Sequence, residues 1–218
     1  MRLRIVRYIR NNQKCRHCNV CETIVSCPNP EECVGCASCF LACPYDAIEP
    51  VKEDVETREV GVRIDGEKFF VPTGVTLKRA FEILGYKFVR FPEEGEKTIF
   101  APCETGGCYA CAVLVDGELK PLCHTAVKED TNIITDVSNV EPVRIVEGFI
   151  PHTVGGVGTP WWIKGHGYIE VACFAAGCNL RCPTCQNFTI TYNSKLEPMS
   201  PKKAATIISV ARRKYGVD

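Results

Sequence analysis

The chain lacks the features by which several classes of protein are recognised. Its 218 residues carry 26 basic and 26 acidic side chains, so the net charge is zero, and nothing electrostatic favours binding to nucleic acid or to an anionic membrane. No stretch approaches the roughly 20 apolar residues of a membrane span. The first ten residues, MRLRIVRYIR, are basic without the apolar run of a signal peptide. We therefore expect a cytoplasmic protein with no nucleic-acid and no membrane partner.

Cysteine, by contrast, is abundant. The 16 cysteines form four groups, and Cys173 alone lies outside them. The groups are Cys15, Cys18, Cys21 and Cys27; Cys33, Cys36, Cys39 and Cys43; Cys103, Cys108, Cys111 and Cys123; and Cys178, Cys182 and Cys185. In a reducing cytoplasm, regular spacings of this kind favour metal-binding thiolates over disulfides. Because metal centres let small modules fold without large apolar cores, we expect three modules.

The second group has the spacing C-x2-C-x2-C-x3-C-P, ending at Pro44, which is typical of bacterial ferredoxins in which the fourth cysteine ligates the other cluster. The first group differs, because five residues separate Cys21 from Cys27. Residues 1–50 thus resemble a two-cluster ferredoxin with a small insertion. The resemblance implies two [4Fe–4S] clusters, with ligand sets Cys15, Cys18, Cys21 and Cys43, and Cys33, Cys36, Cys39 and Cys27. Zinc is the alternative metal that such motifs bind.

Residues 58–138 show a different pattern. Residues 59–65 and 68–72, separated by Gly66, predict two strands, and residues 76–86 predict a helix that ends at Gly85. The pair Asp116-Gly117 predicts a hairpin turn. The spacing C-x4-C-x2-C, with Cys123 after the hairpin, is the plant-type [2Fe–2S] spacing.

These strands, helix, cluster loop and hairpin resemble the β-grasp [2Fe–2S] domains of xanthine dehydrogenase-type oxidoreductases. In the cluster loop, Gly106 and Gly107 are expected to wrap closely around sulfur. His124, next to Cys123, is expected either to tune the cluster or, more simply, to lie at the surface. A zinc-bearing β-domain is the alternative.

Two segments have the composition of linkers. Residues 49–59 are highly charged, and residues 139–160 are rich in Gly, Pro and Val. We expect the first to separate the two N-terminal modules and the second to connect them to residues 161–218.

The fourth group, C-x3-C-x2-C, has only three cysteines. Three thiolates leave one iron of a [4Fe–4S] cluster open, as a catalytic metal requires. The residues GCNLRCPTCQN resemble the radical S-adenosylmethionine (SAM) superfamily, nearest to the branch of pyruvate formate-lyase activating enzyme. The resemblance implies a site-differentiated [4Fe–4S] cluster on Cys178, Cys182 and Cys185 that binds SAM. It also implies that Thr184 lies near the adenine, where the family usually has an aromatic residue.

After this motif we expect one helix, over residues 201–215, and no glycine-rich GGE motif. The chain is therefore expected to hold the first βα part of a radical SAM (β/α) barrel rather than a whole one. Cys173 is expected in a buried position within an apolar strand over residues 168–174, with a role as an extra ligand as the alternative.

The expected fold class is therefore α+β with several modules. The expected function is an iron–sulfur electron-transfer chain that feeds a radical SAM cluster, in which SAM is cleaved to a 5′-deoxyadenosyl radical. Its partners would be an external electron donor and, by resemblance to the activases, a protein substrate. The alternative is a multi-cluster electron carrier without chemistry of its own.

Overall fold

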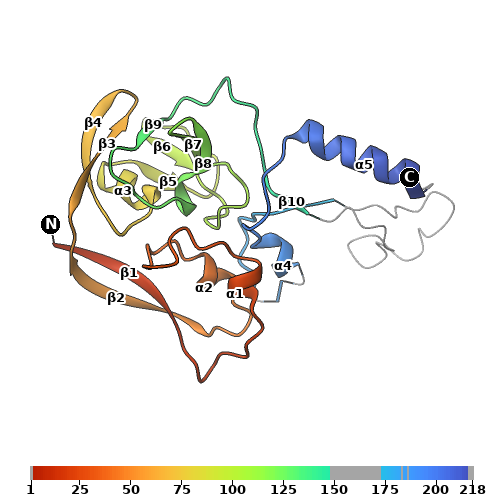
Figure 1. Ribbon diagram of the computed structural model, residues 1–218, viewed down its shortest axis with the longest axis horizontal. Coiled ribbons are helices and arrows are strands. Elements are labelled where there is room, and N and C mark those ends of the chain that lie inside the picture. Colours follow the sequence, from red (N-terminus) through yellow and green to blue (C-terminus); the bar gives the residue numbers. More distant parts are fainter. Residues whose placement is uncertain (1, 148–172, 183, 186, 216–218) are drawn as a thin grey trace.

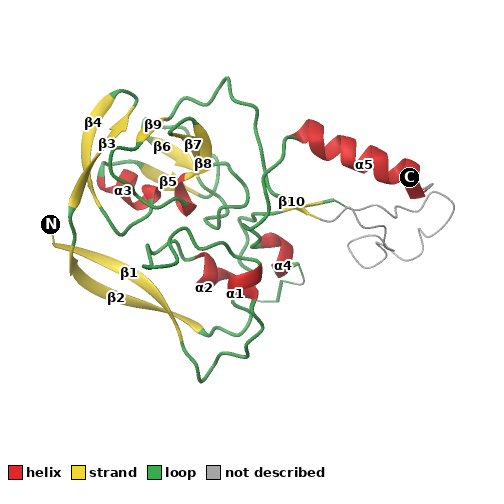
Figure 2. Cartoon of the chain, in the orientation of Figure 1, coloured by secondary structure: helices red, strands yellow, loops and turns green. Residues whose placement is uncertain are grey.

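The computed structural model describes residues 2–147, 173–182, 184–185 and 187–215. Figures 1 and 2 show two N-terminal modules side by side and a C-terminal segment that ends in a projecting helix. The elements in chain order are β1 (Arg2–Arg10), α1 (Val20–Thr23), α2 (Ser38–Ala42), β2 (Ile48–Glu56), β3 (Glu59–Ile64), β4 (Glu67–Pro72), α3 (Leu77–Ile83), β5 (Lys87–Val89), β6 (Thr98–Phe100), β7 (Ala112–Val115), β8 (Glu118–Pro121), the 3-10 turn η1 (Leu122–His124), β9 (Asn132–Ile134), β10 (Val146–Glu147), β11 (Phe174–Ala175), α4 (Phe188–Thr191) and α5 (Pro201–Tyr215).

The first module is a long two-stranded ribbon that carries the first eight cysteines between its strands. β1 and β2 pair antiparallel along their whole length, from Arg2 opposite Glu56 to Arg10 opposite Ile48. The predicted linker over residues 49–59 is therefore wrong, because most of it is β2. Its charged side chains are compatible with a strand since they face solvent and pair across the ribbon, as Arg4 does with Asp54 at 3.1 Å.

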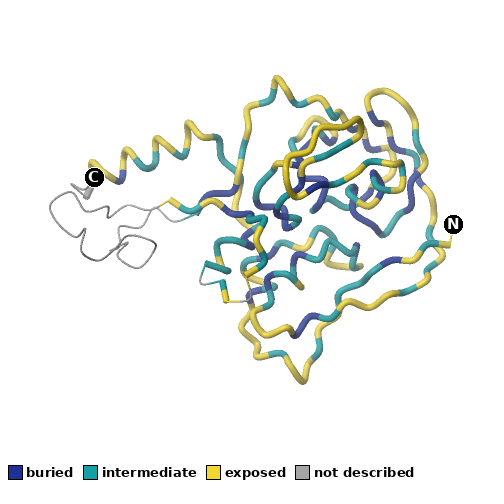
Figure 3. The backbone as a smooth tube through the Cα atoms, turned by 180° about the vertical axis from the view of Figure 1, so that it is seen from behind, coloured by how far each residue is buried: buried dark blue, intermediate teal, exposed yellow. Residues whose placement is uncertain are grey.

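The second module is built on a five-stranded sheet in the order β4-β3-β9-β7-β8, in which β3 and β9 run parallel. Alternate residues of β3 point inward, so that Val60, Val62 and Ile64 are buried. They pack against the buried face of α3, including Leu77 and Phe81. Figure 3 shows this buried interior as dark blue segments. The core anchors both ends of the cluster loop, because Cys111 and Cys123 belong to it.

The local predictions for this module are confirmed. The predicted strands are β3 and β4, and the predicted helix is α3, whose N-cap Thr76 accepts a hydrogen bond from the Arg79 N–H at 3.2 Å. Asp116 and Gly117 both have positive φ, 53° and 84°, and join β7 to β8 as a type I′ turn would.

The C-terminal segment packs on both modules before α5 leaves them. Strands β10 and β11 form a two-stranded antiparallel pair, and Tyr192 joins the small apolar cluster of the first module, with Val20, Val25 and Ala42. The helix predicted over residues 201–215 is confirmed as α5. The strand predicted over residues 168–174 lies almost wholly outside the described residues, as does most of the predicted connector. Within the described ranges, no helix is both long and apolar enough to cross a membrane.

Candidate metal centres

The first predicted ligand set surrounds one pocket. Cys15 and Cys18 lie on the loop between β1 and α1, Cys21 lies in α1, and Cys43 follows the C-terminus of α2. All four line the same small pocket, closed by Val20 and Ile48. Helix α2 packs on α1 and thereby carries the last cysteine of the second motif to the first. The interleaved arrangement that the ferredoxin resemblance implies is thus available to the chain.

The second set lies on the side of the module that faces the sheet. The Cys36 thiol has a raised pKa, chiefly because it is buried, and the charges of Cys27 and Cys33 raise it further. Burial and the charges of Cys36 and Cys33 raise the pKa of Cys39 to about 12. Cys27, although exposed, therefore lies close enough to Cys36 to act on it electrostatically. Binding of iron to these thiols requires that they release their protons.

The backbone around the cysteines fits thiolate ligands of clusters. In all three modules a sulfur accepts a hydrogen bond from the N–H two residues later. The pairs are Cys15 with His17, Cys103 with Thr105, Cys108 with Ala110 and Cys178 with Leu180, at 3.4 to 3.5 Å. Such N–H···S bonds stabilise the charged thiolate and tune a bound cluster. The same loop geometry therefore recurs at the ferredoxin-like, plant-type and three-cysteine motifs.

The plant-type set converges in the second module. Cys103, Cys111 and Cys123 are buried and Cys108 is partly so. Hydrogen bonds from Cys108 and Cys123 lower the pKa of the Cys103 thiol, and a hydrogen bond from Cys123 lowers that of Cys111. The four sulfurs are thus mutual neighbours, as four ligands of a [2Fe–2S] cluster would be.

The two glycines of this loop make room for other parts of the chain. A Cβ on Gly106, whose φ is +81°, would lie 2.8 Å from the His124 side chain. A Cβ on Gly107 would lie 2.8 Å from both Ala176 Cβ and the Asn193 carbonyl oxygen. The expectation that both glycines serve close wrapping around sulfur is therefore incomplete, because the structure also requires them for packing between modules.

His124 is not the surface residue that the simpler expectation described. It is half-buried, and its Nδ1 lies 3.0 Å from the hydroxyl of Ser38 in the first module. Burial lowers the pKa of the imidazole. Ser38 itself is completely buried. No sequence pattern indicated this contact, because the two residues are 86 positions apart.

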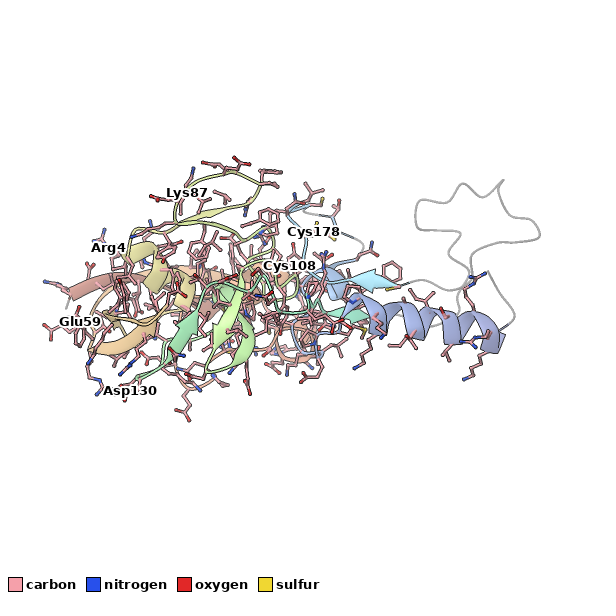
Figure 4. The ribbon with its side chains drawn as sticks, turned by 90° about the horizontal axis from the view of Figure 1, so that it is seen from above. Arg4, Glu59, Lys87, Cys108, Asp130 and Cys178 are labelled. Atoms are coloured by element: carbon pink, nitrogen blue, oxygen red, sulfur yellow. The ribbon has the colours of Figure 1, made fainter. Side chains whose placement is uncertain are left out.

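The three-cysteine loop lies directly on the plant-type loop. Figure 4 labels Cys108 and Cys178, which lie near each other at the junction of the sheet and the C-terminal segment. A Cβ on Gly177 would lie 2.5 Å from Cys108 Cβ, which shows how closely the two loops approach. Arg144 stabilises the backbone at this contact. Its Nε donates to the Ala176 carbonyl at 2.6 Å, and its Nη2 donates to the Gly177 carbonyl.

Arg181, inside the three-cysteine motif, joins the loops by charge. Its Nη2 donates to the Cys103 carbonyl at 3.0 Å and pairs with Glu104 at 3.1 Å. Glu104 also binds Lys78 of α3, and these cations lower its pKa although burial opposes the shift. Neither residue was among the predicted site residues. The only sequence feature that could have indicated them is their position, since Glu104 follows Cys103 and Arg181 lies between Cys178 and Cys182.

Two of the three predicted ligands of the fourth group, Cys182 and Cys185, line an open cavity, whereas Cys178 is not among its lining residues. Cys182, Cys185 and Thr184 line a cavity of about 550 Å³, whose opposite wall includes Cys43 and Phe40 of the first module. Cys182 and Thr184 are exposed, and Cys178 and Cys185 are partly buried. The SAM-binding prediction requires Thr184 to lie close to the cysteines and to be accessible to a small molecule, and its position here meets this requirement.

Cys173 does not occupy the predicted core position. It is exposed and precedes β11, which begins at Phe174. The rest of the predicted strand, residues 168–172, lies outside the described residues.

Across the described ranges, no group of three or more His, Cys, Asp or Glu side chains is arranged to hold a metal ion.

Comparison with known families matches residues 27–49 to the 4Fe-4S binding domain family, Fer4. The matched segment contains the whole second cysteine motif and Cys27. No curated protein matches the chain. The [2Fe–2S] and radical SAM assignments stay predictions. The chain contains a ferredoxin-like 4Fe–4S-binding region, and with it the capacity for iron–sulfur electron transfer.

Proposed function

We propose that the chain carries electrons through two [4Fe–4S] clusters and one [2Fe–2S] cluster to a site-differentiated [4Fe–4S] cluster that binds SAM. The observation that carries the proposal is the direct docking of the three-cysteine loop on both N-terminal modules. Gly177 packs on Cys108 of the second module, and the cavity beside Cys182 and Cys185 is walled by Cys43 of the first. Electron donors and acceptors must lie close together, and this arrangement supplies that proximity within one chain.

Each set of residues has a stated task in this proposal. The N–H···S bonds and buried surroundings stabilise the thiolates that hold the clusters. Arg181 and Glu104 fix the three-cysteine loop in place. Cys178, Cys182 and Cys185 would hold the site-differentiated cluster, and this cluster would supply the electron for reductive cleavage of SAM to methionine and a 5′-deoxyadenosyl radical. Thr184 lines the same cavity as Cys182 and Cys185.

The partners that such a function needs are an external low-potential electron donor and a substrate for the radical. The resemblance to the activase branch favours a protein substrate. A pure electron carrier, in which the clusters act as a wire, is the competing proposal.

The test begins with anaerobic reconstitution of the chain and measurement of iron, sulfide and the electron paramagnetic resonance (EPR) spectrum of the reduced protein. We expect SAM to change the spectrum of one cluster and 5′-deoxyadenosine to form. Cys182→Ala should lose both effects, whereas Cys173→Ala, which removes the cysteine outside the four groups, should keep both. A wild-type spectrum that SAM leaves unchanged would establish the carrier instead. Equal 5′-deoxyadenosine formation by Cys182→Ala would refute the assigned site.

A further inference from the structure

The contact between His124 and Ser38 joins the predicted ligands of two different clusters. His124 follows Cys123 of the plant-type set, and Ser38 lies between Cys36 and Cys39 of the second ferredoxin-like set. The two side chains meet at 3.0 Å, across the boundary between the modules. The two residues are 86 positions apart in the sequence. The hydrogen bond therefore connects the two cluster loops by a much shorter path than the backbone does.

The contact reaches a predicted ligand on each side through one peptide bond. His124 directly follows Cys123, and Ser38 directly precedes Cys39. The two cluster loops are therefore joined by a short chain of Cys123, His124, Ser38 and Cys39, in which the 3.0 Å hydrogen bond is the one step that is not covalent.

The surroundings hold this chain in one geometry. Ser38 is inaccessible to solvent, and the absent side chain of Gly106 leaves the space that His124 fills. The backbone of Ser26, which precedes Cys27, also approaches the imidazole. His124 therefore touches the neighbours of three ligands of one cluster, the set Cys27, Cys33, Cys36 and Cys39. A buried polar network whose members are fixed in this way specifies a single arrangement.

We propose that the chain Cys123–His124–Ser38–Cys39 is the electron route between the two N-terminal modules. The [2Fe–2S] centre would then exchange electrons with the cluster of Cys27, Cys33, Cys36 and Cys39, rather than with that of Cys15, Cys18, Cys21 and Cys43. One centre is oxidised by one electron and the other is reduced by one. No bond is formed or broken and no net proton moves. This inference rests on the proposed cluster content of the chain, and His124 acts in it as a positioning residue.

The test uses the reconstituted full chain and a flash-generated flavin radical as one-electron donor. Freeze-quench EPR follows how the electron redistributes between the [2Fe–2S] and [4Fe–4S] signals. We expect His124→Leu and Ser38→Ala to slow the redistribution several-fold at unchanged iron content. His124→Asn should redistribute the electron at nearly the wild-type rate, because the Asn amide reaches the position of Nδ1. His124→Gln should be as slow as His124→Leu, because the Gln amide reaches the position of Nε2 instead.

Thr105→Val is the matched control, because Thr105 is buried on the same cluster loop and its hydroxyl has no partner among the described residues. It should leave the rate unchanged. Rates in His124→Leu and Ser38→Ala equal to the wild-type rate would overturn the proposal. Loss of a cluster from both variants would also overturn it, since the contact between His124 and Ser38 would then serve to hold the cluster loops in place. A wild-type protein without a [2Fe–2S] signal would instead refute the proposed function, so the two failures are distinguishable.

Discussion

Replacing Glu104 by Gln should weaken the junction between the cluster loops. The Glu104 carboxylate pairs with Lys78 of α3, with Arg90 at 3.4 Å and with Arg181 of the three-cysteine loop at 3.1 Å. Gln keeps nearly the same shape but carries no charge, so Arg181 would lose its carboxylate partner while remaining largely out of water, and Lys78 would keep only Glu82, at 3.5 Å. The substitution therefore tests the electrostatics of the junction without creating a cavity.

The expected loss follows from the exposure of the three side chains. Glu104 is 27%, Lys78 23% and Arg181 20% exposed, so the pairs are stronger than surface ion pairs but are partly screened. Hydrogen bonds to charged groups contribute about 1.5–3 kcal/mol each, and the Gln oxygen still accepts one of them. We expect a net loss of about 2 kcal/mol, which for a chain of this size lowers Tm by about 4–8 °C.

The assay is anaerobic thermal unfolding of the reconstituted protein, with Glu118→Gln as the control. Glu118 pairs with Lys120 but is 73% exposed, so its replacement should change Tm little. The reasoning is refuted if Glu104→Gln and Glu118→Gln shift Tm equally.

The pH dependence gives a second check. Burial alone would raise the pKa of Glu104, but Lys78, Arg181 and Arg90 lower it. A group with a lowered folded-state pKa contributes its stability above its ordinary pKa, about 4.3, and loses it as the pH falls through the lowered value. The gap between wild type and Glu104→Gln should therefore stay constant between about pH 6 and pH 8. A gap that closes within this window contradicts the assignment.

Three further predictions concern single positions. Cys43→Ser should abolish the EPR signal of the cluster in the first pocket although Cys43 belongs to the second motif; loss of the other [4Fe–4S] signal instead would reverse the interleaved assignment. Gly177→Ala should lower Tm by more than Gly85→Ala. Both glycines have positive φ, +81° and +89°, but only a Cβ on Gly177 would lie within 4 Å of another residue, 2.5 Å from the Cβ of Cys108. Equal shifts in Tm would show that the loops separate easily. Thr76→Ala should cost about 1 kcal/mol in unfolding experiments through loss of the α3 N-cap, and an unchanged stability would contradict the capping role.

The sequence predicted best those features that depend on neighbouring residues. The cysteine spacings, the turn at Asp116-Gly117 and the helix over residues 201–215 all arise from interactions within a few positions. The C-x2-C-x2-C-x3-C-P spacing was sufficient to indicate the 4Fe–4S-binding region that the family comparison confirms. Such short-range patterns carry the chemistry of the ligands because one loop must supply several thiolates.

The sequence failed where the partner of a segment lies far along the chain. Residues 49–59 were interpreted as a linker because strand formation there depends on β1, more than forty positions earlier. Charged residues at exposed positions of a two-stranded ribbon leave no apolar alternation to detect. Cys173 was placed in a core because residues 168–174 were interpreted as one apolar strand, whereas Cys173 is exposed and lies before β11.

The sequence by itself determined which side chains can hold clusters and which local turns and helices carry them. Only the tertiary structure decided how the loops that carry them meet, because those contacts join residues without any common pattern. His124 with Ser38 and Glu104 with Arg181 are separated by 86 and 77 positions. Their pairing results from the packing of whole modules, and a spacing rule describes ligands on one loop but not the approach of one loop to another.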